Sequence, residues 1–451
     1  MTNAIRKILS SLFIYHSSNT MIEKAEREQI IALINREVVP AIGCTEPIAV
    51  ALCVAKATET LGCRPEKIQA LLSANILKNA MGVGIPGTGM IGLPIAIALG
   101  ALIGKSEYQL EVLKNSTPEA VEEGKKLIDA QAIHISLKEG ITEKLYIEII
   151  CEAEGRQATA IISGGHTNFV YVAKGKEVLL NKQTATSDES DIQDVTLTLR
   201  KVYDFATTSP SEELKFILET RNLNKNAAER SFQGNYGHQL GKTLNSKKNS
   251  SLMMGDNTFT HILSYTSAAC DARMAGAMIP VMSNSGSGNQ GITATLPVVV
   301  YAEDNHKSEE ELIRALTLSH LTAIYIKQSL GRLSALCGCV VAATGSSCGI
   351  TYLMGGSYEQ ITYAVKNMIA NITGMICDGA KPSCALKLTS GVSTAVLSAI
   401  LAMENKCVTS VEGIIDDDVD RSIRNLTRIG SQGMNETDKL VLDIMTHKKC
   451  D

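Results

Sequence analysis

Hydrophobic and polar positions in the first part of the chain recur with the period of an α-helix. The stretch "IEKAEREQIIALINREVVPAI" starts at Ile22 and "IAVALCVAKATETL" ends at Leu61, with the break "GCTEP" between them. Apolar residues three and four positions apart predict two helices here. "KIQALLSANILKNAM" is expected to continue as helix, and the glycine-rich "GVGIPGTGMIG" is expected to form a loop beside a ligand.

The pattern changes near Leu110, where runs of β-branched residues with partial alternation follow one another. Such runs, separated by turn residues, predict the strands of a small antiparallel sheet; they are "AIHISLKEG", "LYIEIICEAEG", "QATAIISGG" and "FVYVAKGKEVLL". "TPEAVEEGKKLIDA" predicts a helix that packs on the sheet. The polar "NKQTATSDESD" is expected to be a linker that closes this region near Asp191.

Helical periodicity then continues almost without interruption to the end, as in "EEELIRALTLSHLTAIYIKQSL", "YEQITYAVKNMIANIT", "CALKLTSGVSTAVLSAILAME" and "DDDVDRSIRNLTRIG". The predicted fold class is α+β, a mostly helical body that contains the functional site, with an inserted antiparallel-sheet subdomain. We expect a disordered extension at residues 1–21, a helical catalytic body at 22–108 and 192–451, and the inserted α+β subdomain at 109–191.

Composition and charge narrow the class of protein. The chain of 451 residues has 43 basic and 47 acidic side chains spread along it, without a basic stripe, so no nucleic acid partner is expected. Its 12 cysteines are scattered, which favours a reducing compartment and hence the cytoplasm. Residues 79–104 and 333–358 are uncharged and long enough for a bilayer of roughly 30 Å, but they lack aromatic and basic flanks. No membrane association is expected.

The stretch "MICDGAKPSC" contains Cys377 and Cys384, and Cys337 and Cys339 stand about forty residues upstream. Soft thiolate donors in this number suit an iron-sulfur cluster or zinc. Structural zinc sites usually have two tight Cys-x2-4-Cys pairs, which this spacing lacks. Buried cysteines that act as small hydrophobic residues are the alternative, above all for Cys339 and Cys348.

Four separated motifs together resemble the L-cysteine desulfidase family, relatives of the iron-sulfur L-serine dehydratases: "AIGCTEPIAVAL", "SNSGSGNQGI", "LSALCGCVVAATG" and "GMICDGAKPSCALK". The resemblance covers nearly the whole chain after Met21. It implies one 4Fe-4S cluster held by Cys337, Cys377 and Cys384. Cys450 is a further candidate for the fourth position, although a solvated thiol in the C-terminal tail is favoured.

The resemblance implies a carbon-sulfur lyase that converts L-cysteine to pyruvate, ammonia and hydrogen sulfide, an activity of cysteine catabolism. Three protein thiolates leave one iron of the cluster open to act as a Lewis acid, whereas four would close it. An iron-sulfur L-serine dehydratase is the alternative enzyme. A non-enzymatic iron-sulfur sensor is a weaker alternative, because no DNA-binding motif accompanies the thiols.

β-Elimination also needs a base for the α-proton. "GCTEP" places Cys44 directly before a predicted helix, whose partial positive charge is expected to lower the pKa of the thiol from ~8.5 toward neutrality. The proton-abstracting residue of the family is a cysteine in this motif, which corresponds to Cys44. A cysteine that is simply packed at this point is the alternative.

The glycine-rich "SNSGSGNQG" is a candidate binding loop for the carboxylate of an amino acid substrate. Its glycines let backbone amides point inward, and side-chain donors are added by Asn284, Ser285, Asn289 and Gln290, of which the last two are favoured. An ordinary helix-capping turn is the alternative.

A second candidate for substrate binding is "ISGGHTNFV", which places His166, Thr167 and Asn168 after a predicted strand. A histidine in a turn at a strand end can hydrogen-bond to substrate or relay a proton.

The stretch "GTGMIG" at residues 87–92 matches a G-x-G-x-x-G dinucleotide-binding motif, with Glu107 twenty residues after Gly87. A helical pattern precedes it and no βαβ unit follows, so no nicotinamide cofactor is expected. We expect this loop to pack near the active site. The related dehydratases have a histidine-containing glycine loop in a similar place, where this chain has Met90 and Ile91, which leaves proton abstraction to another group.

The expected partner is a small amino acid substrate, with homo-oligomerisation left open.

Overall fold

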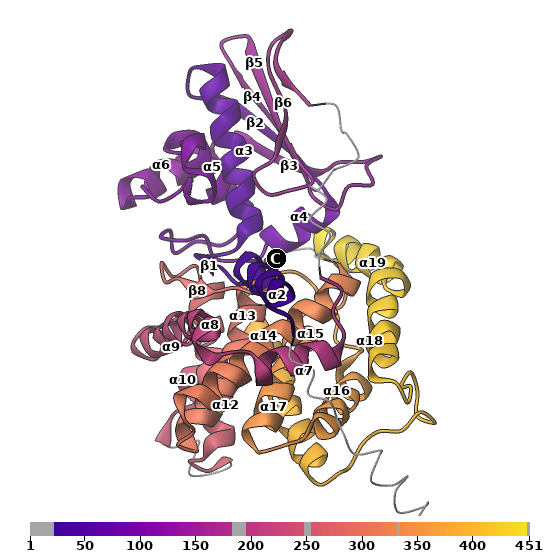
Figure 1. Cartoon of the computed structure of the whole chain (residues 1–451). Coiled ribbons are helices and arrows are strands. Elements are labelled where there is room, and N and C mark those ends of the chain that lie inside the picture. The colour runs from indigo at the N-terminus through magenta and orange to yellow at the C-terminus, as the bar shows by residue number, and fades with distance from the viewer. Residues whose placement is uncertain (1–21, 183–194, 248–253, 332–333, 449–451) are drawn as a thin grey trace, which may run out of the picture.

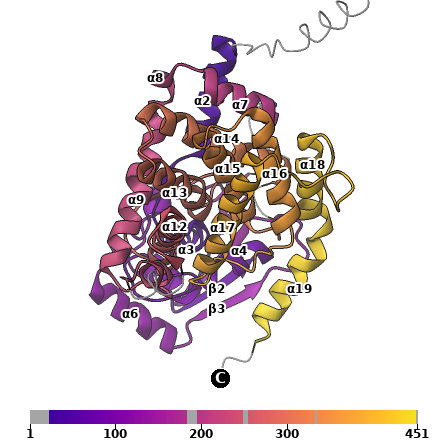
Figure 2. The ribbon, with the colours of Figure 1, turned by 90° about the horizontal axis from the view of Figure 1, so that it is seen from below.

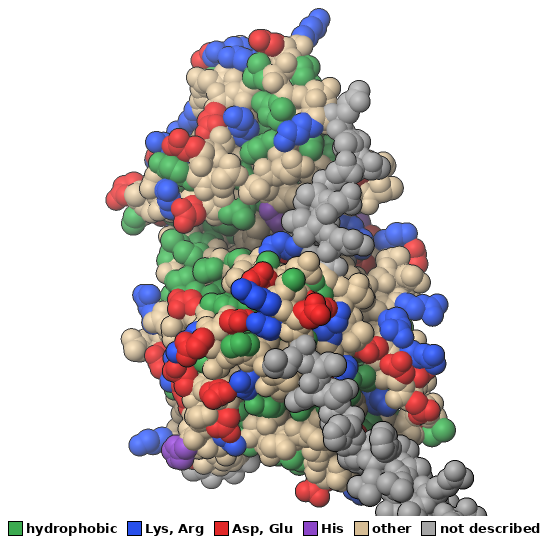
Figure 3. All heavy atoms as spheres, viewed as in Figure 1, with side chains coloured by type: hydrophobic (Ala, Val, Ile, Leu, Met, Phe, Trp, Pro, Cys, Tyr) green, Lys and Arg blue, Asp and Glu red, His purple; other side chains and the backbone are tan. Residues whose placement is uncertain are grey.

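The computed structural model describes residues 22–182, 195–247, 254–331 and 334–448. These residues form two lobes, one built around a six-stranded sheet and one almost entirely helical (Figure 1). The molecular surface narrows between the lobes (Figure 3). The α+β class expected from the sequence is confirmed. The expected extension at residues 1–21 and most of the expected linker after Lys182 lie outside the described residues.

The strands of the six-stranded sheet follow the order β3-β2-β4-β5-β6-β7. All neighbours pair antiparallel except β2 and β3, which pair parallel, so the sheet is mixed and not purely antiparallel as expected. The strand bounds are β2 Lys67–Leu72, β3 Ile133–Leu137, β4 Tyr146–Ala153, β5 Arg156–Ser163, β6 Phe169–Lys174 and β7 Glu177–Asn181.

Strand β2 corrects the sequence prediction, which continued the helix through this segment. Ile68, Ala70 and Leu72 are buried while Lys67 and Gln69 are exposed, and this alternation has the period of a strand. Only the following α4 (Ala74–Ala80) is helical. Pairing with β3 on one side and β4 on the other fixes the strand, and these partners are distant in the sequence.

Three helices lie on one face of this sheet, α3 (Thr45–Leu61), α5 (Leu93–Leu102) and α6 (Pro118–Asp129). α3 contacts β4 and β5 directly. Alternate residues of these strands are buried beneath it, including Ile147, Ile149 and Ala160. The unit built around the sheet therefore begins at α3, well before the expected boundary at residue 109.

The helical body packs α12, α13, α14, α15 and α17 around a second hydrophobic core. The helix bounds are α2 Lys24–Glu37, α7 Leu199–Thr208, α8 Ser211–Leu214, α9 Leu218–Gln233, α10 Leu240–Leu244, α12 Thr258–Met274, α13 Gly288–Asp304, α14 Glu309–Leu330, α15 Gly338–Leu353, α16 Tyr358–Ile372, α17 Cys384–Met403, α18 Val419–Arg428 and α19 Asn435–Thr446.

Contacts at several places join the lobes within the described part of the chain. β1 (Pro40–Ala41), shortly before α3, pairs with β8 (Val281–Met282) of the body. The glycine loop at residues 82–92 packs on the end of α12, where Gly84 N donates to Met274 O at 2.9 Å. Helix α4 lies beside α19, as Figure 1 and Figure 2 both show, and buried Lys78 forms an ion pair there with Asp438.

Among the described helices, only α17 is long and apolar enough to cross a membrane, with a mean hydropathy of 1.5. It packs against α12, α15 and α16 as a helix of the body. The two uncharged stretches noted in the sequence contain α5 and α15, of 10 and 16 residues. Both are shorter than the ~20 residues that a membrane-spanning helix needs.

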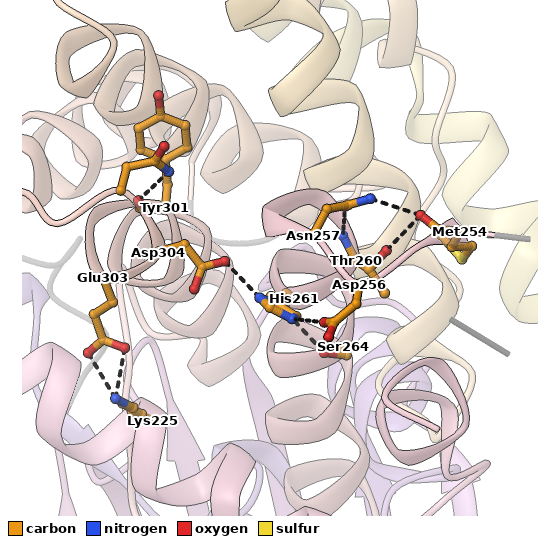
Figure 4. Close-up of polar contacts among 11 residues, drawn as sticks. Lys225, Met254, Asp256, Asn257, Thr260, His261, Ser264, Tyr301, Glu303 and Asp304 are labelled. Carbon is orange, nitrogen blue, oxygen red and sulfur yellow. Dashed lines mark hydrogen bonds and ion pairs between the residues drawn. The ribbon is translucent and has the colours of Figure 1, made fainter. Parts of the chain in front are cut away.

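The ends of α12 and α13 that face away from the sheet lobe are tied together by His261. Its Nδ1 lies 2.7 Å from Asp304 Oδ2, and its Nε2 lies 2.7 Å from Asp256 Oδ1 (Figure 4). Burial acts to lower the pKa of His261, but the hydrogen bonds to the two carboxylates outweigh it and the pKa is raised. The imidazolium form, which donates from both nitrogens, therefore stabilises this end of the body.

Candidate active site

Cys337 and Cys377 lie on two extended segments that run antiparallel to each other. The segments meet in a bridge between Leu336 and Ile376, and Cys377 N donates to Ala335 O at 2.7 Å. Residues on either side of such a bridge project from the same face. The two thiols are therefore diagonal neighbours, with Cβ atoms about 7 Å apart by the usual spacing of such pairs.

The third thiol of the predicted ligand set comes from Cys384, the first residue of α17. Burial, together with negative charge on Cys377 and on Cys384, raises the pKa of Cys337 to about 12. The three thiols are thus close enough to influence one another's ionisation. The fold brings together residues that the sequence places in two separate motifs.

Two lysines surround the thiols. Lys387 Nζ donates to Ile376 O at 2.8 Å and forms an ion pair with Asp378, and Lys381 Nζ lies 2.5 Å from Asp378 Oδ1. Burial acts to raise the pKa of Asp378, but hydrogen bonds from both lysines lower it to about 2. Two ammonium groups against one carboxylate leave net positive charge, and Lys387 acts to lower the pKa of Cys337. The lysines thus act in favour of a thiolate, although burial outweighs them at Cys337.

Three helix N-termini point into the same region. Cys44 is the N-cap of α3, Cys337 is the N-cap of α15, and Cys384 opens α17. The partial positive charge at a helix N-terminus stabilises a thiolate or an anionic cluster next to it.

The geometry of the donors bears on the kind of metal group that fits. Within the described ranges, no three His, Cys, Asp or Glu side chains lie close enough to share a single metal ion. A four-iron cluster requires a wider arrangement, because each thiolate binds its own iron. The diagonal placement of Cys337 and Cys377, the nearby Cys384 and the positive surroundings fit such a cluster.

Cys44 lies within electrostatic reach of Cys384 and beside Arg273. The sequence predicted a lowered pKa for this thiol, and that prediction is wrong. Cys44 is 2% exposed, and burial raises its pKa to about 12, although the Arg273 guanidinium acts in the opposite direction. Desolvation of the charged form outweighs the helix N-terminus here.

Arg273 of α12 is a site residue that the sequence analysis did not identify. Its Nη1 donates to Asn289 Oδ1 and its Nη2 donates to Gly43 O, each at 3.0 Å. It therefore joins the turn before Cys44 to the glycine-rich binding loop. A single arginine inside the apolar "TSAACDARMAGAMIPVM" is the sequence signal that could have identified it.

The favoured residues of the binding loop, Asn289 and Gln290, lie in the first turn of α13 at this site. Asn289 Oδ1 also accepts from Cys270 Sγ at 3.6 Å. Gln290 is 4% exposed, and its Oε1 has no hydrogen-bond partner among the described residues. A Cβ on Gly338 would lie 2.9 Å from Gln290 Cδ, so this side chain packs against the residue that follows Cys337.

Asn284 and Ser285 of the same loop face a buried network instead. Asn284 Nδ2 donates to both Nδ1 and the carbonyl oxygen of His320, and Asn284 Oδ1 accepts from Ser285 Oγ at 2.9 Å. Asn284 is fully buried. These contacts position the loop, and a direct contact of either residue with substrate stays a prediction.

His166, Thr167 and Asn168 lie in the turn between β5 and β6, in the sheet lobe. Asn168 Nδ2 donates to Ser163 O at 2.9 Å, which closes the turn. Ser163 pairs with Tyr146, and Tyr146 O accepts from the residue that caps α4. The turn is thus at the end of the sheet next to α4, and its contact with substrate stays a prediction.

The remaining candidate residues and motifs contact other parts of the fold. The "GTGMIG" loop follows α4 and precedes α5, and its backbone packs on the end of α12, where Gly87 N donates to Gly276 O. Cys339 Sγ donates to Lys387 O at 3.2 Å. Cys348 is buried within α15, and Cys450 lies outside the described residues.

Comparison with known proteins gives one family and a set of relatives. The model of the family described as serine dehydratase alpha chain matches residues 107–443. A UPF0597 protein of Phocaeicola vulgatus is 85% identical over 431 residues, which are 96% of this chain and 100% of the relative. UPF0597 proteins of Bacteroides thetaiotaomicron and Oleidesulfovibrio alaskensis are 75% and 45% identical over 428 and 427 residues, 95% and 94% of this chain and 99% of each relative.

Proposed function

The chain belongs to the serine dehydratase alpha chain family, and we propose that it is a lyase that acts by β-elimination and releases hydrogen sulfide from L-cysteine. The products are hydrogen sulfide, ammonia and pyruvate. The observation that carries the proposal is that Cys44 lies near Cys384. Cys384 in turn lies near Cys337, the partner of Cys377. A base and a group that accepts the leaving sulfur must both reach one small substrate.

Cys337, Cys377 and Cys384 are the residues that would hold a 4Fe-4S cluster. Such a cluster, held by three thiolates, supplies a Lewis-acidic iron for the leaving atom of the substrate. Lys381 and Lys387 contribute positive charge that offsets the charge of the thiolates, and Asp378 holds both ammonium groups in place.

Cys44 is the proposed base. The Cys44 thiol first gives its proton to water. The thiolate then takes the proton from Cα, the electron pair of the C–H bond forms the Cα–Cβ double bond, and the C–S bond breaks to release hydrosulfide. The resulting aminoacrylate tautomerises to an imine, and water hydrolyses it to pyruvate and ammonia. A raised pKa makes the Cys44 thiolate a stronger base, and the ammonium group of the substrate favours the ionised thiol when it lies nearby.

The chemistry of the leaving group supports L-cysteine. Hydrosulfide is a much weaker base than hydroxide, whose conjugate acid, water, has a pKa of about 15.7, so hydrosulfide departs more easily from Cβ. Lys381 and Lys387, the lysines beside the thiols, are both bound to Asp378 and are not poised as free acids. L-Serine is the second candidate substrate, and the description of the matching family favours it.

The test supplies L-cysteine and L-serine separately to anaerobically reconstituted protein and follows pyruvate and sulfide. The proposal expects both products from L-cysteine at a kcat/KM at least about ten times that for L-serine. The opposite preference would replace the desulfidase with a dehydratase. Absence of pyruvate from both substrates would refute the lyase.

A further inference from the structure

Arg273 is a buried cation without an anionic partner among the described residues. Arg273 is 6% exposed, and its guanidinium donates to two neutral oxygens, those of Gly43 and Asn289, and also contacts the Cys44 thiol. Its Nε has no hydrogen-bond partner among the described residues. By contrast, the buried cation Lys78 faces the carboxylate of Asp438.

A charged group in this position is costly unless a counter-charge compensates it. Removing an ion from water costs several kcal/mol even after relaxation. Cys44 does not supply the counter-charge in the resting protein, because burial keeps the pKa of its thiol at about 12. A guanidinium with free donors and no anion is therefore prepared for an anion that comes from outside the chain.

The surroundings of Arg273 leave room for its donors only because of a glycine. A Cβ on Gly288 would lie 2.2 Å from Arg273 Nε, so a larger residue there would displace the guanidinium. Gly288 is the first residue of α13, whose N-terminus adds partial positive charge. Close by, the Oε1 of Gln290 is also buried without a partner among the described residues and can accept from a ligand.

We propose that Arg273 binds the α-carboxylate of the amino acid substrate. This inference rests on the proposed function and names the anchor for its substrate. A carboxylate held between Arg273 and the first turn of α13 places Cα beside Cys44, whose thiol lies next to the same guanidinium. The β-substituent then extends toward Cys384 and its neighbouring thiols. Arg273 thus acts as a binding residue that orients the bond to be broken.

The test measures the binding of L-alanine, which has no leaving group and cannot react, to the cluster-loaded full-length protein by isothermal titration calorimetry. L-Alaninamide, which keeps the ammonium group but lacks the carboxylate, is the matched ligand. Wild-type protein is expected to bind L-alanine about 10- to 100-fold more tightly than L-alaninamide, as the loss of a charge-assisted hydrogen bond predicts. Arg273→Gln removes this preference, and Arg273→Lys retains part of it.

Arg27→Gln is the matched control, because Arg27 pairs with Glu213 on the body away from the thiols. It should bind both ligands as the wild type does. Equal affinity of the wild-type protein for L-alanine and L-alaninamide would overturn the inference without any variant. So would unchanged L-alanine affinity in Arg273→Gln while the wild type still forms pyruvate. Absence of pyruvate formation by the wild type would instead refute the proposed function. Failure of the Arg273 inference and failure of the lyase proposal are thus distinguishable.

Discussion

Cys44 and Cys384 each stand at the start of a helix, and they lie within electrostatic reach of each other although they come from opposite ends of the chain. The pairing of β1 with β8 and the packing of the 82–92 loop on α12 bring their lobes together. The proposed base and one proposed cluster ligand therefore lie near each other where the two lobes meet. An active site assembled in this way depends on the relative position of both lobes.

Substitution of any one proposed ligand should remove the cluster. Cys337→Ser, Cys377→Ser and Cys384→Ser are each expected to lose most of the bound iron and inorganic sulfide after anaerobic reconstitution, because the remaining two thiolates do not hold the cluster. Iron and acid-labile sulfide analysis measures the loss.

Two control variants make this prediction specific. Cys339→Ala should keep the cluster, because the Cys339 thiol is already engaged with Lys387 O. Cys407→Ser, on the half-buried segment after α17, should keep it as well. Full iron content in Cys377→Ser, or its loss in Cys339→Ala, would contradict the proposed ligand set.

Cys44→Ser should separate proton removal from cluster binding. The variant is expected to retain iron and to lose turnover by about 10²- to 10⁴-fold, the usual contribution of a positioned base. Pyruvate formation under saturating L-cysteine measures the loss, and Cys63→Ser, in the sheet lobe, provides the control. Turnover at the wild-type rate would remove Cys44 from its proposed role.

Replacing either partner of the Lys78–Asp438 ion pair should lower the stability of the protein, but by different amounts. The Lys78 side chain is 2% exposed and that of Asp438 is 21% exposed. Asp438→Asn leaves a buried cation unpaired and should lower the free energy of unfolding by about 3 kcal/mol, and Lys78→Met should cost less. Urea unfolding followed by circular dichroism tests this order. Lys126→Met, in an exposed pair with Glu123, should change little.

His261 should make stability depend on pH. Its folded-state pKa is raised above the unfolded value of ~6.5, so its stabilisation is fully present below ~6.5 and is lost as pH rises through the folded-state pKa. The melting temperature of His261→Asn should therefore fall below that of the wild type by more at pH 6 than at pH 9. Exposed His134→Asn is the control. A difference that is the same at both pH values would refute this role of the contacts in Figure 4.

Local sequence patterns predicted many elements well. Helix α14 spans Glu309–Leu330, as the segment quoted from the sequence predicts, because Ser308 caps it and forms a capping box with Glu311. Strands β4 and β5 follow their alternating patterns. In these elements the local propensity, the capping residues and the burial of one face agree.

Features that depend on distant partners were missed. The sequence predicted helix for strand β2, because this short alternating run directly precedes helix α4. Only its pairing with β3 and β4 identifies the segment as a strand. The helix N-terminus that follows Cys44 is visible in the sequence, but the burial that raises the pKa of the Cys44 thiol is not. Arg273 belongs to no local motif, because its partners Gly43 and Asn289 come from two other segments.

The central claim is that Cys337, Cys377 and Cys384 hold one iron-sulfur cluster with an open iron. Mössbauer spectroscopy of ⁵⁷Fe-reconstituted protein, together with iron and sulfide analysis, tests it most directly. The account predicts about four irons and about four inorganic sulfides per chain, with one iron whose spectrum changes when L-cysteine is added. A colourless protein that binds stoichiometric zinc, or a cluster whose four irons are all unaffected by L-cysteine, would contradict it.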